Sequence, residues 1–172
     1  RIHALVGSSV GGFQAIEWVV SQPERFDRLI LIATDAFASP WTIAIDETQR
    51  MAIEADPTFG QPTPDAGAKG LAAARAIGLL TYRGAAGYNL TQTDSPQQTQ
   101  AGSLIPREQR RPCTYQQYQG LKLIRRYNAY SYHTILNAFD THDVGRNRGG
   151  REKALAAIEC PTIVIGITTD MI

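Results

Sequence analysis

The chain has 172 residues, which is the size of one domain, and its formal net charge is +1. Hydrophobic residues make up 43% and charged residues 19%, as is typical of a globular protein. This composition indicates no nucleic-acid or membrane partner, and no apolar run reaches the roughly 20 residues of a membrane span. No signal-peptide pattern stands at its start, so we expect a cytoplasmic protein.

The first part of the chain predicts a strand, a helix and a second strand. Residues 2–6 form a short apolar run, which favours a strand buried on both faces. Gly11 and Gly12 open a helix that Pro23 ends, and the apolar run 28–33 predicts the next strand. This order over about thirty residues is typical of a βαβ unit, so we expect the two strands to be parallel.

The middle of the chain predicts helices and no strand. The expected helices run over residues 39–55, 66–83, 115–127 and 129–140. We interpret the Pro-rich residues 57–65 and the Gln- and Thr-rich residues 88–112 as loops.

The last part returns to the α/β pattern, with a helix over 152–158 and a third strand over 162–167. We therefore predict an α/β fold with a partial core of three parallel strands, formed by residues 1–34 and 152–172. A helical insertion, residues 35–151, interrupts it.

The sequence Gly7-Ser8-Ser9-Val10-Gly11 stands between the first strand and its helix. This G-x-S-x-G pattern is typical of a nucleophile elbow, a tight turn that presents one serine hydroxyl. Ser9 is the predicted nucleophile, and the backbone N–H of Val10 is the predicted donor to the oxyanion.

A serine nucleophile needs a base and an acid that orients it. Asp170 follows the third strand, where functional groups of α/β sheets gather, so it is the candidate acid; a carboxylate that only caps its loop is the alternative. The three histidines, His3, His133 and His142, precede Asp170, although the elbow order is Ser, Asp, His. We expect the base to lie outside this chain.

Two further features invite a functional interpretation. Arg75 and Tyr82 share one predicted helix face with apolar residues and with Gly78, so the guanidinium needs a carboxylate from the protein or from a ligand. The stretch 140–143 contains two Asp and one His, but a helix C-terminus with a solvated histidine explains it better than a metal site, and we expect no metal.

The chain resembles the homoserine O-acetyltransferases of the α/β-hydrolase superfamily over nearly all its length. The resemblance is carried by six segments: 6–18, 74–78, 81–83, 118–120, 128–132 and 168–170. The elbow is common to many esterases, whereas the segments around Arg75, Tyr82 and Tyr118 to Tyr132 are more specific. Val10 departs from the methionine usual in the family, and the loop from Asn89 to Pro112 matches no pattern in it.

This resemblance implies acetyl transfer from acetyl-CoA to L-homoserine in methionine biosynthesis, with acetyl-CoA as co-substrate and no other cofactor. Ser9 matches the acylated serine, Asp170 the acid of the triad, Arg75 the arginine that holds the substrate carboxylate, and Tyr82 the tyrosine beside it. The insertion would be the lid, which also forms a homodimer contact. Homoserine O-succinyltransferase, serine O-acetyltransferase and a serine esterase that uses water are the alternatives.

The chain enters a strand almost at its first residue, Arg1, and ends at Ile172 just past another. A natural domain rarely begins and ends inside its own core, so we expect a fragment of a longer protein. The resemblance implies that it holds three of the usual eight strands and is inactive in isolation.

Overall fold

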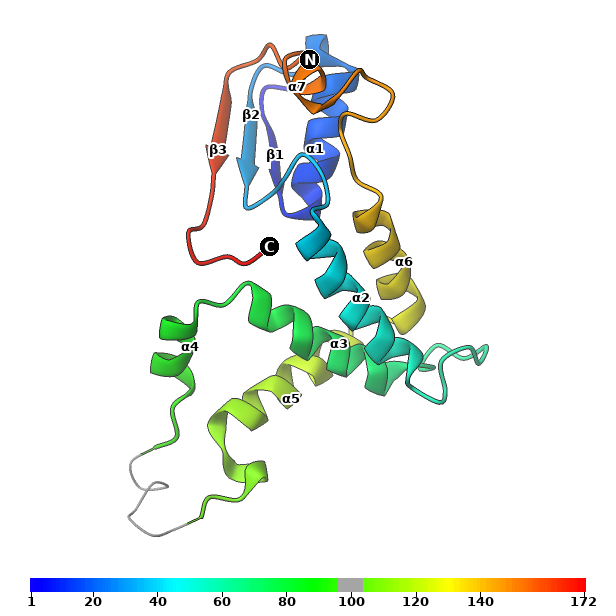
Figure 1. The fold of residues 1–172 in the computed structure, drawn as a ribbon, viewed down its shortest axis with the longest axis vertical. Coiled ribbons are helices and arrows are strands. Elements are labelled where there is room, and N and C mark those ends of the chain that lie inside the picture. Colours follow the sequence, from blue (N-terminus) through cyan, green and yellow to red (C-terminus); the bar gives the residue numbers. More distant parts are fainter. Residues whose placement is uncertain (96–103) are drawn as a thin grey trace. The chain divides into compact units, whose positions relative to one another are not determined.

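The computed structural model describes residues 1–95 and 104–172 (Figure 1). Its strands are β1 (Leu5–Ser8), β2 (Leu29–Ile32) and β3 (Thr162–Ile165). Its α-helices are α1 (Val10–Ser21), α2 (Pro40–Glu54), α3 (Ala68–Thr81), α4 (Ala85–Gln92), α5 (Arg111–Ile124), α6 (Ala129–Asp140) and α7 (Arg151–Leu155). Short 3-10 turns cover Pro23–Arg25 and Arg107–Gln109.

The described chain divides into two compact units. Unit 1 comprises residues 1–43 and 137–168, and unit 2 comprises residues 44–136 and 169–172. These boundaries differ from the predicted ones, because residues 35–43 and 137–151 pack with the sheet and not with the helical insertion. The last four residues pack with the helices of unit 2.

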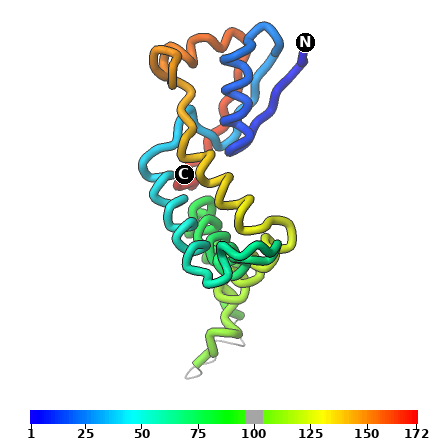
Figure 2. The backbone as a smooth tube through the Cα atoms, turned by 90° about the vertical axis from the view of Figure 1, so that its right-hand side faces the viewer, coloured from blue at the N-terminus to red at the C-terminus, as the bar shows by residue number. Residues whose placement is uncertain are grey.

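The sheet of unit 1 has the strand order β1-β2-β3, and all pairs are parallel, as predicted. Its register pairs Leu5 with Leu29 and Ser8 with Ile32. The predicted strand 2–6 was placed too early: β1 runs over Leu5–Ser8, and Ile2 forms only an isolated bridge with Phe26. Figure 2 shows the tube of β1 running beside the coil of α1, to which a single sharp turn joins it.

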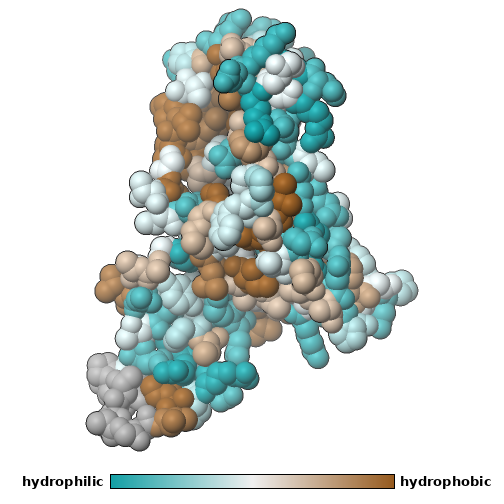
Figure 3. Space-filling model, in the orientation of Figure 1, coloured by the Kyte–Doolittle hydropathy of each residue, from teal (hydrophilic) through white to brown (hydrophobic). Residues whose placement is uncertain are grey.

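The expectation that the first strand is buried on both faces was wrong. Val6 is 58% exposed, and every residue of β3 is exposed, with Val164 at 69%. The core of unit 1 lies on one side, where Leu29 and Leu31 of β2 pack with residues of α1 and α7. Figure 3 shows apolar side chains gathered over β3, so this part of the sheet presents hydrophobic surface.

Close packing between β1 and α1 depends on glycine. A Cβ added at Gly7 would lie 2.4 Å from the Gly11 carbonyl oxygen, and one at Gly12 would lie 2.3 Å from Oγ1 of Thr34. No heavy atom lies within 4 Å of a Cβ added at Gly11. The packing of α1 therefore requires glycine at Gly7 and Gly12, of which only Gly7 belongs to the G-x-S-x-G pattern.

Unit 2 consists of helices, as predicted for the insertion. The carboxylate of Asp56, between α2 and α3, accepts hydrogen bonds from the N–H of Gly70 at 2.9 Å and from the N–H of Thr58 at 3.0 Å. These bonds, together with the hydroxyl of Thr58, lower the pKa of Asp56 to about 2. An ionised carboxylate thus anchors the first turn of α3, where it also complements the helix dipole.

The predicted loop 88–112 is only partly a loop. Helix α4 covers Ala85–Gln92, and α5 already begins at Arg111. The sequence signal for α4 is weak, because the helix has eight residues, none of them buried, and no hydrogen-bonding side chain at its N-cap. Residues 96–103, the middle of the predicted loop, lie outside the described residues.

No helix in the described part of the chain is both long and apolar enough to cross a bilayer.

Gly12→Ala is predicted to destabilise unit 1 by about 1–3 kcal/mol, because the new methyl group overlaps the side chain of Thr34. Gly11→Ala is the matched control in the same helical turn, and we expect it to be neutral or slightly stabilising. Urea denaturation of both variants measures the difference. Equal midpoints for the two variants would contradict the close packing at Gly12.

Candidate active site

Ser9 sits in the sharp turn that the sequence predicts between β1 and α1. Its backbone has φ 50° and ψ −128°, an uncommon conformation for a residue with a side chain. Holding such a residue costs about 1–3 kcal/mol, so the surrounding structure must enforce the conformation. The side chain of Ser9 is exposed, as the nucleophile of an elbow must be.

Backbone hydrogen bonds enforce this turn from both sides. The N–H of Ser9 donates to the carbonyl of Ile32 at 3.0 Å and to that of Ala33 at 3.1 Å. The carbonyl of Ser9 accepts from the N–H of Gly12 at 2.8 Å and from Oγ1 of Thr34 at 2.7 Å. The loop that follows β2 therefore clamps the serine turn in place.

Val10 is the first residue of α1, so its N–H belongs to the turn whose N–H groups have no intrahelical acceptor. The partial positive charge at a helix N-terminus favours a negative charge there. The predicted oxyanion donor thus directly follows Ser9, at the end of the helix where an anion is stabilised.

Arg75 and Tyr82 lie together in unit 2. Nη1 of Arg75 donates a short hydrogen bond to the hydroxyl of Tyr82, and its guanidinium carbon lies 5.5 Å from the centre of that ring. Burial raises the pKa of Tyr82, whereas the charges of Arg75 and Arg83 lower it. The hydrogen-bond partner of Arg75 is thus the neutral hydroxyl of Tyr82. Because this partner does not neutralise the guanidinium, its charge can still bind a ligand carboxylate.

Asp170 belongs to unit 2 as well, five residues beyond the end of β3. The N–H of Met171 donates to the carbonyl of Thr81 at 3.0 Å, which holds the segment against the end of α3. The charge of Asp170 also raises the pKa of Tyr82, although less than burial does. One oxygen of Asp170 accepts a 3.3 Å hydrogen bond from the N–H of Ile172, as a loop-capping carboxylate would.

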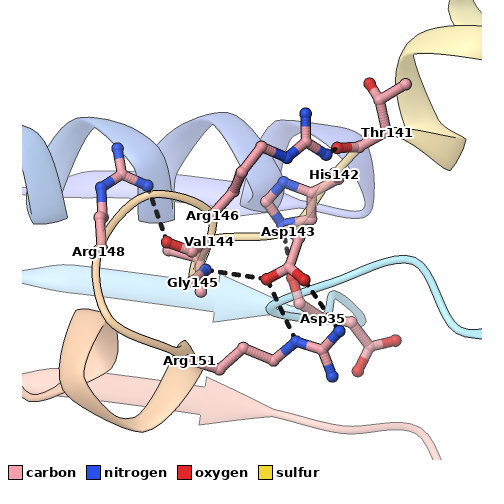
Figure 4. Close-up of polar contacts among 9 residues, drawn as sticks. All are labelled: Asp35, Thr141, His142, Asp143, Val144, Gly145, Arg146, Arg148 and Arg151. Atoms are coloured by element: carbon pink, nitrogen blue, oxygen red, sulfur yellow. Dashed lines mark hydrogen bonds and ion pairs between the residues drawn. The ribbon is translucent and has the colours of Figure 1, made fainter.

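Residues 141–151 form a loop in unit 1 that its own polar groups hold together (Figure 4). The carboxylate of Asp143 accepts from the N–H of Gly145 at 2.9 Å and pairs with Arg151, also at 2.9 Å. Arg148 donates to the carbonyl of Val144 at 2.9 Å. Asp143 is therefore engaged as a structural acceptor, which agrees with the interpretation of 140–143 as a helix end.

His142 is not the solvated side chain that we expected. Its ring stacks on Phe13 with centroids 4.1 Å apart, and its Nε2 donates to the carbonyl of Asp35 at 3.3 Å. Burial lowers its pKa below the ordinary value of 6.5. Phe13, in the first turns of α1, lines a cavity of about 480 Å³ together with His142.

Sequence reasoning missed three residues that shape the site. Thr34 bonds the carbonyl of Ser9, and the buried Gln49, which bonds the half-buried Tyr132, borders the helix face that carries Arg75. The pairing of Thr34 with Ser9 joins residues 25 positions apart, and no local pattern marks it. Gly78 has no side chain on the helix face of Arg75, and this was the sequence feature that could have indicated a close neighbour there, which is Gln49.

The chain belongs to the alpha/beta hydrolase fold family, whose model matches residues 1–172. The homoserine O-acetyltransferase of Cyclobacterium marinum is 43% identical over 172 residues, which are all of this chain and 47% of that protein. The resemblance seen in the sequence is thus confirmed, and the chain spans about half the length of the curated relatives that it matches.

Two solved structures share the fold. The homoserine O-acetyltransferase of Bacillus anthracis has a TM-score of 0.84 and 22% identity, with 99% of this chain and 46% of that chain covered. Esterase E22 has a TM-score of 0.79 and 21% identity, with 98% of this chain and 47% of that chain covered. At these identities the two structures support the fold of this chain.

His142→Phe is predicted to reduce the loss of stability in mild acid. Because folding depresses the pKa of His142, the unfolded chain binds this proton more readily, and stability falls as the pH drops below about 6.5. Phenylalanine keeps a ring against Phe13 but cannot titrate. Urea midpoints from about pH 7 to pH 5 should fall less for this variant than for the wild type.

His3→Gln is the control, because the side chain of His3 is 81% exposed. We expect it to follow the wild-type pH dependence. If His142→Phe showed the same pH dependence as the wild type, protonation of His142 would not be a cause of the loss of stability in acid.

Proposed function

We propose that the full-length protein transfers an acetyl group from acetyl-CoA to the hydroxyl of L-homoserine through an ester on Ser9. The observation that carries the proposal is the backbone of Ser9, with φ 50° and an exposed side chain at the start of a helix. The relatives of 37–43% identity named homoserine O-acetyltransferase support the choice of substrates.

The reaction takes two half-reactions. In the first, Oγ of Ser9 attacks the thioester carbonyl, a general base takes the hydroxyl proton, and the N–H of Val10 stabilises the oxyanion until CoA leaves. In the second, the hydroxyl of homoserine attacks the acetyl ester and releases Ser9. Asp170 is the assigned acid that orients the base, and we assign the base to a histidine outside these 172 residues.

We assign acceptor binding to the helices of unit 2. The guanidinium of Arg75 would bind the carboxylate of homoserine, and Tyr82, which accepts from Arg75, retains its own proton for the same carboxylate. Acetyl-CoA is the co-substrate, and the scheme requires no cofactor or metal. We further propose a cytoplasmic enzyme of methionine biosynthesis that forms a homodimer through the helical insertion.

Hydrolysis of the acyl-enzyme by water is the second candidate, since an esterase shares the fold. CoA release with and without homoserine separates the two functions. Release that requires no acceptor and yields acetate would identify an esterase. Comparing acetyl-CoA with succinyl-CoA, and homoserine with serine, tests the two substrate alternatives in the same assay.

Ser9→Ala is predicted to abolish the acetyl-enzyme, because no other hydroxyl occupies the turn. Intact-mass spectrometry of the full-length protein after mixing with acetyl-CoA should show an added acetyl group in the wild type and none in the variant. Ser8→Ala, which changes the neighbouring exposed serine of β1, should still be acetylated. Acetylation that survives in Ser9→Ala would refute Ser9 as the nucleophile.

Arg75→Ala is predicted to leave acetylation of Ser9 intact and to lower kcat/KM for homoserine by about 100-fold, because the substrate carboxylate loses its charged partner. Arg126→Ala, at an exposed arginine of the same unit, should behave as the wild type. Steady-state kinetics with homoserine provide the measurement. Normal transfer by Arg75→Ala would remove this residue from the binding site.

A further inference from the structure

A chain of three polar groups, of which Asp46 and Gln49 are buried and Tyr132 is half-buried, borders the helix face of Arg75 and Tyr82 in unit 2. The hydroxyl of Tyr132 donates to Oε1 of Gln49 at 2.7 Å, and Nε2 of Gln49 donates to Oδ1 of Asp46 at 3.1 Å. Asp46 is 5% exposed and Gln49 is 4% exposed. Neither the resemblance nor the roles proposed above assign a purpose to these groups.

Gly78 places this chain beside Arg75. Residues 75, 78 and 82 share one face of α3 and its last turn, by their spacing of three and four. A Cβ added at Gly78 would lie 2.6 Å from Oε1 of Gln49, the same atom that accepts the proton of Tyr132. The hydroxyl of Tyr132 therefore lies one hydrogen bond away from the atom that faces Gly78, a residue on the helix face of Arg75 and Tyr82.

The directions of these hydrogen bonds follow from the groups involved. The amide Nε2 of Gln49 donates to Asp46, so the carbonyl oxygen of Gln49 is the atom that faces Tyr132. The single proton of Tyr132 is then committed to Gln49. The phenol oxygen of Tyr132 keeps its lone pairs, so toward any other partner it is an acceptor.

Tyr82 has the opposite character. Its oxygen accepts from Arg75, so its own proton is left to donate. Burial keeps Tyr132 a neutral phenol, since it raises the pKa of this group to about 12. Arg75 and Tyr82 thus offer donors, and Tyr132 offers an acceptor whose partner Gln49 is hydrogen-bonded to Asp46.

We propose that the phenol oxygen of Tyr132 accepts a hydrogen bond from the α-ammonium group of the acceptor substrate whose carboxylate Arg75 and Tyr82 bind. An α-amino acid carries an anion and a cation on neighbouring atoms, and this part of unit 2 presents both a donor set and an acceptor. Tyr132 is thereby a binding residue that selects α-amino acids over other hydroxy acids. This assignment rests on the function proposed above.

Tyr132→Phe in the full-length protein tests the assignment with two acceptors, L-homoserine and 4-hydroxybutyrate, which lacks the amino group. We expect kcat/KM for homoserine to fall about 10- to 100-fold, the usual effect of losing a hydrogen bond to a charged group. Transfer to 4-hydroxybutyrate and formation of the acetyl-enzyme should equal those of the wild type. Intact acetylation shows that the variant has folded.

Tyr130→Phe is the matched control on the same helix, where the hydroxyl of Tyr130 donates to the carbonyl of Gln61 at 2.6 Å. It should leave the preference for homoserine over 4-hydroxybutyrate unchanged. If Tyr132→Phe lowers kcat/KM equally for both acceptors, or for neither, the assignment of Tyr132 is wrong but the proposed function is unaffected. Wild-type protein that forms no acetyl-enzyme, or does not pass the acetyl group to homoserine, overturns the proposed function as well.

Discussion

The backbone conformation of Ser9 is the constraint on which the rest of unit 1 depends. A residue with φ 50° and ψ −128° is unfavourable in isolation, and the structure enforces it with contacts that tolerate no extra atom. Gly7 and Gly12 let α1 pack directly against β1 and the loop after β2, and Thr34 bonds the carbonyl of Ser9. The strained turn lowers the stability of unit 1, and in return it presents one hydroxyl at the positive end of a helix.

In unit 2 the polar side chains are held by burial and by directed hydrogen bonds, and not by a strained backbone. Asp56 anchors the start of α3, the helix that carries Arg75. Further along the same helix, Gly78 admits Gln49, whose amide is oriented between Asp46 and Tyr132. These oriented polar groups fit the zwitterionic acceptor proposed above, whereas the turn of Ser9 in unit 1 does not indicate which acceptor is used.

Much of this architecture could be predicted from the sequence where the signals are local. The helix over Ala129–Asp140 was expected at its observed bounds, with a break at Asn128, and Oδ1 of Asn128 accepts a 2.8 Å hydrogen bond from the N–H of Ser131. The turn at Ser9 and the parallel strands followed in the same way. Features that depend on residues far apart in the sequence could not be predicted from it. These are the hydrogen bond from Thr34 to Ser9, the stacking of His142 on Phe13, and the exposure of Val6 and β3. Helix α4 was missed because it buries no residue and so has no hydrophobic period to reveal it.

The central claim is that the turn between β1 and α1 makes Ser9 a uniquely reactive hydroxyl. Its most direct test is to treat the full-length protein with a fluorophosphonate, which reacts with activated serines, and to locate the adduct by peptide mass spectrometry. The account predicts one adduct on Ser9, with the adjacent Ser8 unmodified. An adduct on any other serine, or an unreactive protein, would contradict it.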